Sequence, residues 1–349
     1  MSFSPTSTKQ VVILLGPSCD EIGGIQTVIR TYLSWSLDGY EFIHIPTWVS
    51  KRESLVEVAK AVGSLFSIRG MAAETICHFH LSHKGSMIRE GLLAAFARLL
   101  GFRMYATVHG SQFAELTRTS KFWRYVEKQA LSSFVRIGVL NQESLAAVGT
   151  LGLGERTRII PNPSPIAPSS LPSESISVAD SLVTVFAGTI GTRKGVDVLL
   201  DAWRAVQALQ PRAVLEICGP IEPGFSHPEL ESYYRGELSH PEVVSRLAKA
   251  RIAVLPSRAE AMPMFVLEAL ALGRCLVVTD VGAMKSQVGQ AGIVVEAGNS
   301  QMLSSALLQL LSDDDVALST ASHARNQLPD QKDSWNDLVG FYSSGAEVL

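Results

Sequence analysis

The sequence lacks the features that mark secreted, disulfide-bonded and membrane-spanning proteins. Its four cysteines are Cys19, Cys77, Cys218 and Cys275. They are scattered and form no CxxC pair, which argues against a disulfide framework and predicts buried free thiols in a reducing compartment. The first ten residues are polar, and no uncharged apolar run approaches the roughly 18 residues of a membrane span. We therefore expect a cytoplasmic protein, with peripheral attachment to the inner face of the cytoplasmic membrane left open.

The sequence also lacks the spacings that hold common cofactors and metals. It contains no GxxxxGK[ST] loop and no GxGxxG fingerprint. His78, His80 and His83 alternate along a strand-like run without a nearby cysteine or carboxylate, so we expect no metal site there. The net charge of −3 and the lack of a recognised motif argue against nucleic acid as a partner. We expect neither a bound metal nor a cofactor.

What the sequence does contain is enough apolar material for two hydrophobic cores. Hydrophobic residues make up 46% of the 349 residues and charged residues 18%, which is a globular composition. A chain of this length exceeds the usual size of a single core. Residues 1–165 have 17 Lys and Arg against 12 Asp and Glu, whereas the rest of the chain has 13 against 21. The basic first half suggests an anionic partner, although a mixed solvated surface is an equal alternative.

Short β-branched runs alternate with helix-period segments along almost the whole chain. The expected strands are 11–15, 41–45, 75–80, 104–108, 135–140, 158–160, 182–188, 213–219, 251–257, 275–280 and 292–296. This alternation predicts parallel sheets covered on both faces, and the Pro- and Ser-rich stretch 161–175 predicts a linker. The expected division is into domains at 1–165 and 181–328, a linker at 166–180 and a C-terminal helix at 329–349. Ligands of such sheets bind beyond the carboxyl ends of the strands, and here we also expect them in a cleft between the domains.

Two strand-to-helix turns have the composition of anion-binding turns. Gly23 and Gly24 precede a helix, where glycine lets the backbone approach a ligand, although an ordinary tight turn has the same composition. After the strand at 182–188, Arg193 and Lys194 stand just before another helix. Two cations beside helix-terminal amides suit a diphosphate, and a solvated basic pair is the alternative.

A third turn carries two carboxylates. Glu260 follows an expected strand, and Glu268 is the only charged residue of an apolar helix that we expect to begin at Pro263 and to be capped by Gly273. Burial of an unpaired carboxylate is costly, so Glu268 needs a partner, either a ligand or a cation such as Arg274. Carboxylates together with helix-terminal amides suit a phosphorylated, polyhydroxylated ligand.

These turns resemble, in order, those of a known family. Glu260 and Glu268, with the spacing E-x7-E and followed by ALALG, resemble the signature of retaining nucleotide-sugar glycosyltransferases of family 4, which have the GT-B fold. Similar segments, in the same order, are GGIQTVIR, TVHG, RIIPNPS, FAGTIGTRKGVDVLLDAW, ICGP, AKARIAVLPS and the terminal SWNDLVGFY. The resemblance spans nearly the whole chain. It implies two doubly wound, Rossmann-like α/β domains with an inter-domain cleft, and a last helix that crosses back to the first domain.

The resemblance also implies a role for each of these residues. Glu268 is expected to bind the ribose of a nucleotide, Glu260 the transferred sugar, and Lys194 the leaving diphosphate. His109 is expected to orient the sugar, so the implied catalytic residues are Glu260, His109 and Lys194. The other implied donor-binding residues are Gly23, Gly24, Thr189, Arg193, Met262, Pro263, Met264 and Phe265, the last four through their backbone.

Two positions depart from the family pattern. Thr189 stands where a clamp arginine is usual, a role that Arg193 is positioned in the sequence to take over, and Ser286 stands where a glutamate is common. The implied activity is that of a retaining, metal-independent hexosyltransferase. It moves a hexose from a UDP- or GDP-sugar to a glycan or lipid-linked acceptor in cell-surface polysaccharide biosynthesis. A nucleotide-sugar epimerase and a catalytically silent nucleotide-sugar-binding protein remain alternatives.

The acceptor side is expected in the first domain. Residues 84–103 combine cations with apolar side chains, and residues 118–128 add four cations and further aromatic residues. Such a composition fits an anionic membrane surface or a lipid diphosphate. An ordinary core helix followed by a solvated helix is the alternative.

Overall fold

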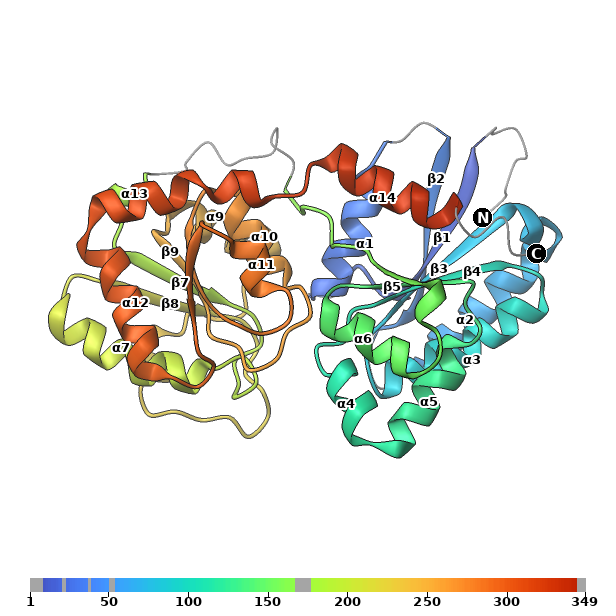
Figure 1. Ribbon diagram of the computed structural model, residues 1–349, viewed down its shortest axis with the longest axis horizontal. Helices are drawn as coiled ribbons and strands as arrows, with labels where there is room; N and C mark the ends of the chain where they lie inside the picture. The colour runs from blue at the N-terminus through green and yellow to red at the C-terminus, as the bar shows by residue number, and fades with distance from the viewer. Residues whose placement is uncertain (1–8, 21–22, 37–38, 50–53, 167–176, 344–349) are drawn as a thin grey trace. The chain divides into compact units, whose positions relative to one another are not determined.

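The computed structural model of the chain describes residues 9–20, 23–36, 39–49, 54–166 and 177–343. Most of the predicted linker at 166–180 therefore lies outside the described residues. The chain divides into two compact units (Figure 1): the first comprises Met1–Pro163 with Gln331–Leu349, and the second Ser164–Asp330. Within the described ranges, no helix combines the length and the apolar character that a membrane crossing requires.

The first unit contains a six-stranded parallel sheet with the strand order β2-β1-β3-β4-β5-β6. Its strands are β1 (Gln10–Pro17), β2 (Tyr40–Trp48), β3 (Thr75–Leu81), β4 (Arg103–Val108), β5 (Arg136–Val139) and β6 (Thr157–Ile159). In the middle of the sheet, Ile13 of β1 lies between Ile43 of β2 and Cys77 of β3. Every residue of β3 is buried, as expected for a parallel strand covered by helices on both faces.

The helices of the first unit connect these strands, and one of them comes from the far end of the chain. They are α1 (Gly24–Ser34), α2 (Ser54–Ser67), α3 (Gly85–Leu99), α4 (Phe113–Thr119), α5 (Lys121–Leu131), α6 (Gln142–Thr150) and α14 (Gln331–Ser343). The predicted return of the last helix is confirmed, because α14 belongs to the first unit. Tyr342 of α14 is buried there, and the Tyr105 hydroxyl of β4 donates to its carbonyl oxygen at 2.7 Å.

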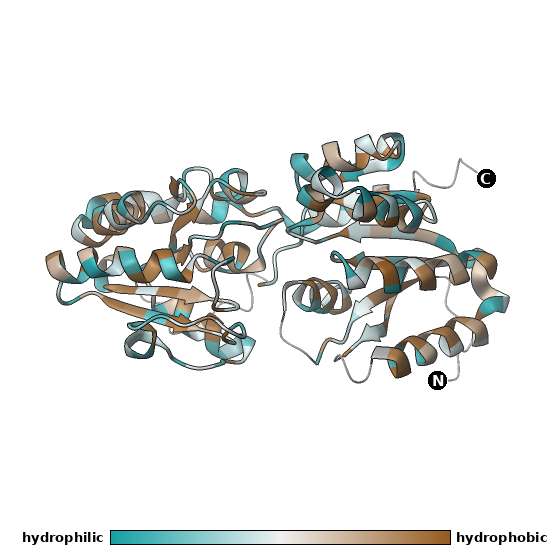
Figure 2. Ribbon diagram, turned by 90° about the horizontal axis from the view of Figure 1, so that it is seen from below, coloured by the Kyte–Doolittle hydropathy of each residue, from teal (hydrophilic) through white to brown (hydrophobic). Residues whose placement is uncertain are grey.

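The second unit repeats the architecture with a five-stranded parallel sheet in the order β11-β10-β9-β7-β8. Its strands are β7 (Val183–Ala187), β8 (Val214–Cys218), β9 (Ile252–Leu255), β10 (Cys275–Thr279) and β11 (Gly292–Val295). Its helices are α7 (Val196–Leu209), α8 (Leu230–Tyr233), α9 (His240–Lys249), α10 (Met264–Ala271), α11 (Met284–Val288), α12 (Ser300–Ser312) and α13 (Asp314–Ser322). The expected doubly wound α/β class is therefore confirmed. Helices in both units carry hydrophobic and hydrophilic residues along their length (Figure 2).

Local details differ from the sequence predictions at two places. Pro263 is the N-cap of α10 with an extended ψ of 133°, so the helix begins one residue later than predicted, whereas Gly273 does follow the helix with a left-handed φ of +67°. All four cysteines are free thiols, but only three are buried, because Cys19 is half-buried.

Candidate functional site

Two cations of the second unit stand in a tight turn after β7. Gly195 caps α7 with a φ of +71°, and a Cβ atom there would lie 2.0 Å from the Pro256 carbonyl oxygen, so only glycine fits. A Cβ atom at Gly188 would lie 3.6 Å from Lys194 Cε, which shows that the lysine stem passes over this glycine. The glycines therefore bring Arg193 and Lys194 close to the end of the sheet.

Glu260 lies in the loop after β9 and meets these cations. Its Oε1 atom is 2.6 Å from Lys194 Nζ and 3.6 Å from Arg193 Nη1, and it accepts a hydrogen bond from Ser257 Oγ at 2.9 Å. Only 8% of the Glu260 side chain is exposed. No hydrogen bond reaches its Oε2 atom from the part of the chain that the structure describes. One oxygen is thus held by the protein while the other is left as an acceptor.

Arg258 connects the two loops, a role that no sequence pattern indicates. Its guanidinium forms two parallel hydrogen bonds with Asp197, at 2.8 and 2.7 Å, and its backbone N–H donates to the Arg193 carbonyl oxygen at 2.8 Å. Arg193 in turn donates to the Ala259 carbonyl oxygen at 3.1 Å. The cation-bearing loop and the Glu260 loop are therefore fixed to each other.

Glu268 lies inside α10, a helix whose residues are all buried. Its Oε1 atom is 2.9 Å from Nε2 of His240, the first residue of α9. The predicted alternative partner, Arg274, instead donates to backbone carbonyl oxygens, among them those of Leu272 and Ala250. The predicted alternative, a pairing of Glu268 with Arg274, is therefore wrong. The partner that the sequence did not indicate is His240.

The remaining predicted positions of the second unit surround these groups. Pro263, Met264 and Phe265 are buried at the start of α10, whereas Met262 just before it is half-buried. Thr189 is exposed, so the position of the missing arginine opens to solvent. Ser286 is exposed on α11, where its hydroxyl donates to the Ala283 carbonyl oxygen at 2.8 Å. The structure thus places the second-unit candidates on the loops that follow β7 and β9 and on the helices α10 and α11.

The first-unit candidates lie at the ends of β1 and β4. Gly23 caps α1 and Gly24 begins it, and the Thr27 N–H donates to the Gly23 carbonyl oxygen at 3.0 Å. His109 follows β4, and its Nε2 atom is 3.0 Å from Nδ1 of His80 on β3. His109 is half-buried, whereas His80 is only 1% exposed. His80 therefore fixes the ring of the histidine that the sequence predicts to orient the sugar.

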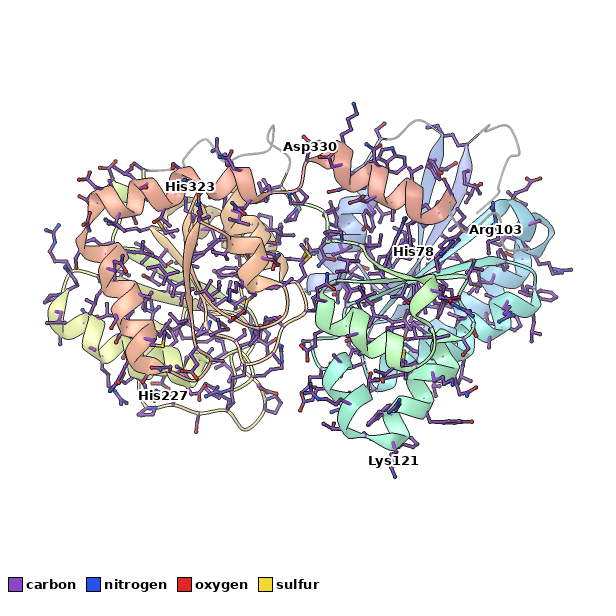
Figure 3. The ribbon with its side chains drawn as sticks, in the orientation of Figure 1. His78, Arg103, Lys121, His227, His323 and Asp330 are labelled. Carbon is purple, nitrogen blue, oxygen red and sulfur yellow. The ribbon has the colours of Figure 1, made fainter. Side chains whose placement is uncertain are left out.

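A third histidine, His78, extends this row of rings into the core. The rings of His78 and His80 stack with 4.5 Å between their centroids. His78, which Figure 3 labels among the strands of the first unit, lies 2.7 Å from the Tyr342 hydroxyl and 2.8 Å from Thr107 Oγ1. Burial lowers the pKa of His78 and of His109 to about 3, and the pKa of His80 falls well below its ordinary value for the same reason. All three rings are therefore neutral at neutral pH.

Comparison with known proteins agrees with this geometry. Residues 181–313 match a family model described as "Glycosyl transferases group 1". A curated relative, the D-inositol 3-phosphate glycosyltransferase of Corynebacterium urealyticum, is 31% identical over 180 residues, which cover 46% of this chain and 42% of the relative. The alignment thus spans less than half of that relative's own length.

Solved structures resemble both units. Sucrose-phosphate synthase from Thermosynechococcus elongatus has a TM-score of 0.72 and 15% identity, covering 96% of this chain and 99% of that one. HepE from Anabaena, solved in complex with UDP-glucose, has a TM-score of 0.70 and 16% identity, covering 97% and 99%. The chain therefore has the GT-B fold of glycosyltransferases. The match to the glycosyl transferases group 1 model lies within the second unit.

Proposed function

We propose that the protein is a retaining hexosyltransferase that uses a UDP- or GDP-sugar and needs no metal. The observation that carries the proposal is the pair of buried glutamates, of which Glu260 lies against the cations of the β7 turn and Glu268 against His240. Each glutamate keeps one carboxylate oxygen without a hydrogen bond from the described residues. Two fixed acceptors beside two cations suit a ligand that has hydroxyl groups at both ends and a diphosphate between them.

In this proposal the protein stabilises the charge that develops on the leaving diphosphate. Lys194 provides the principal cation, and Arg193 supplies a second one in place of the arginine missing at Thr189. Lys194 forms an ion pair with Glu260 Oε1. An arriving diphosphate would draw part of this interaction to itself, and Glu260 Oε1 could then accept a hydrogen bond from a sugar hydroxyl. Fixed cations of this kind act without reorganisation during the reaction. The backbone at the start of α10, from Met262 to Phe265, completes the site.

The first unit contributes Gly23, Gly24 and His109 in this proposal. A neutral His109, oriented by His80, can donate or accept one hydrogen bond to a sugar hydroxyl. HepE, which shares the fold, was solved with UDP-glucose, and this supports a UDP-linked hexose as donor. A glycan or a lipid-linked saccharide in cell-surface polysaccharide biosynthesis is the acceptor class that we propose.

A surface of the first unit supports a lipid-linked acceptor. Its exposed apolar side chains, on α3 and α5, are Ile88, Leu92, Leu99, Phe122 and Tyr125, with exposed fractions from 42% to 86%. The helices lie against each other, since a Cβ atom at Gly91 would be 2.7 Å from Ala130 Cβ. We call this surface the α3–α5 face.

The charges on the α3–α5 face have one sign. The only acidic residues of the two helices, Glu90 and Glu127, are both fully buried. The exposed charged residues of the helices are Arg98, Lys121, Arg124 and Lys128. Lys121 extends away from the unit (Figure 3). Exposed apolar side chains flanked only by cations fit the interface of an anionic bilayer, so we propose peripheral attachment to the cytoplasmic membrane through this face.

Flotation with vesicles tests this attachment. We expect the protein to float with vesicles that contain phosphatidylglycerol and to stay at the bottom with phosphatidylcholine alone. Leu92→Ser combined with Leu99→Ser should abolish flotation. Leu209→Ser is the matched control, because Leu209 is 69% exposed on the second unit. Flotation that is equal for all variants, or absent for the wild-type protein, would contradict the attachment.

Donor turnover tests the activity itself. We expect Lys194→Met to lower the rate of transfer from a UDP- or GDP-hexose by about 100- to 1,000-fold, the usual effect of removing one group that stabilises a transition-state charge. Lys285→Met is the control, because Lys285 is an exposed lysine paired only with exposed Asp280. Full activity of Lys194→Met would overturn the assignment. Turnover without any acceptor would indicate the epimerase, and donor binding without turnover the silent binding protein.

A further inference from the structure

We propose that His240 is a positioning residue that holds Glu268 for recognition of the nucleotide ribose, and so makes the protein discriminate against 2′-deoxynucleotides. This inference rests on the proposed function, because it assumes that Glu268 faces a nucleoside. It adds a residue that neither the family signature nor the spacing of the two glutamates indicates. His240 and Glu268 are 28 positions apart and lie on different helices.

His240 is itself held in place by the start of its helix. It is the first residue of α9, and the preceding Ser239 donates its backbone N–H to Glu242 Oε2 at 2.8 Å. The Ser239 side chain in turn accepts a hydrogen bond from the backbone of Glu242, which completes a capping box. The capping box and Pro241 in the first turn fix where the helix begins. The direction from which His240 approaches Glu268 is therefore set by the backbone rather than by a flexible loop.

Glu268 is more deeply buried than His240, and one of its carboxylate oxygens is left for a ligand. The side chain of His240 is 35% exposed, whereas that of Glu268 is 7% exposed. Glu268 Oε1 is 2.9 Å from His240 Nε2, and Oε2 receives no hydrogen bond from any described residue. A carboxylate oxygen has two lone pairs, so Oε1 can accept a second hydrogen bond while Oε2 accepts another. Two neighbouring acceptors match the 2′- and 3′-hydroxyl groups of a ribose.

The physical role of His240 is to keep the carboxylate pointed at the ligand. Without a donor on Oε1, a carboxylate inside an apolar helix would lose its compensation for burial. It would then rotate toward another donor or toward solvent, and this rotation would weaken its acceptance of ribose hydroxyls. A residue that only stabilised the fold would not alter the preference between ribose and deoxyribose.

The test compares each nucleotide with its deoxy counterpart by isothermal titration calorimetry. The probes are UDP and 2′-deoxy-UDP, with GDP and 2′-deoxy-GDP as the second pair. For the pair that binds, we expect the wild-type protein to prefer the ribonucleotide about 10-fold or more, which is the usual effect of one hydrogen bond to a charged group. His240→Ala should reduce this preference to about 2-fold or less. His240→Gln, whose amide can donate to Oε1, should restore part of it.

Two controls separate the possible failures. His323→Ala replaces a half-buried histidine of the same unit, labelled in Figure 3, and should keep the full preference. Thermal unfolding of His240→Ala should match the wild-type protein, and His240→Gln carries the test if it does not. Wild-type binding without a preference for ribose, or a full preference in His240→Ala, would overturn this inference while the transferase assignment stands. If the wild-type protein binds neither the uridine pair nor the guanosine pair, both this inference and the transferase assignment are overturned.

Discussion

The two units share one architecture but treat their buried polar groups in opposite ways. In the first unit, burial keeps three histidines neutral and raises the pKa of the Glu127 carboxyl group. In the second unit, buried Glu260 and buried Arg251 are each paired with an opposite charge. The difference matters because a neutral interior creates little electric field, whereas paired charges can be shared with a charged ligand.

The first unit neutralises its groups by burial. Its three core histidines have lowered pKa values, and burial raises the pKa of the Glu127 carboxyl group to about 7 and that of Glu90 above its ordinary value. Thr117 explains why Glu127 tolerates protonation. Its hydroxyl lies 2.9 Å from the Phe113 carbonyl oxygen and 2.6 Å from Glu127 Oε2, but it has one hydrogen to donate. A protonated Glu127 supplies the second hydrogen.

The second unit compensates its charges instead. Glu260 lies against Lys194, Glu216 accepts from Arg246 at 2.7 Å, and buried Arg251 donates to Asp314 at 2.6 Å. A compensated cation can turn toward a diphosphate without first being desolvated. This contrast agrees with our proposal that the second unit binds the nucleotide-sugar and that the first unit meets neutral hydroxyl groups and the acceptor.

The sharpest way to break this comparison is to remove a neutralised carboxyl group. A folded-state pKa of about 7 against an unfolded value near 4.5 means that the parent loses stability as the pH rises from 5 to 8. We expect Glu127→Gln to be more stable than the parent by about 2 to 3 kcal/mol at pH 8 and by about 1 kcal/mol or less at pH 5.

Urea unfolding in a Trp203→Phe background measures this effect, because Trp203 is the second unit's single tryptophan and the remaining fluorescence then reports the first unit. Glu143→Gln is the control, since the Glu143 side chain is 58% exposed. If the gain in unfolding free energy of Glu127→Gln did not grow with pH, the Glu127 carboxyl group would not be neutralised by burial.

The core histidines of the first unit should give a pH dependence of stability with the opposite sign. With a folded pKa of about 3 and an ordinary value of 6.5, His78 contributes stability that is present above pH 6.5 and is lost as the pH falls. Between pH 7 and pH 5 the parent should lose about 2 kcal/mol more than His78→Gln. The same fluorescence assay checks this, and parallel curves for the two proteins would argue against a neutral histidine core.

The smallest effect is expected for a charge pair of the second unit. The Arg258 and Asp197 side chains are 35% and 32% exposed, so solvent screens their attraction. Arg258→Ala should lower the free energy of unfolding by about 1 kcal/mol or less, measured by circular dichroism during urea unfolding. A loss of several kcal/mol would mean that such pairs hold the second unit together rather than merely ordering its loops.

The sequence predicted most of the fold because its signals are local. Each expected strand corresponds to an observed one, and the restart of the alternation after the Pro- and Ser-rich stretch indicated a second unit. The same local patterns placed Lys194, Glu260 and Glu268 on turns at the ends of strands or on the following helix. Helix boundaries were less certain, as Pro263 shows, because cap and first-turn positions have similar compositions.

What the sequence by itself determined is therefore the succession of elements and the residues that stand at their ends, since hydrophobic periodicity and turn composition act over a few residues. Only the tertiary structure decided which side chains meet. Arg258 reaches Asp197 across 61 positions, and His78 reaches Tyr342 across 264. These contacts depend on the order and register of the strands, which bring distant segments together. For this reason Glu268 pairs with His240 and not with the nearby Arg274.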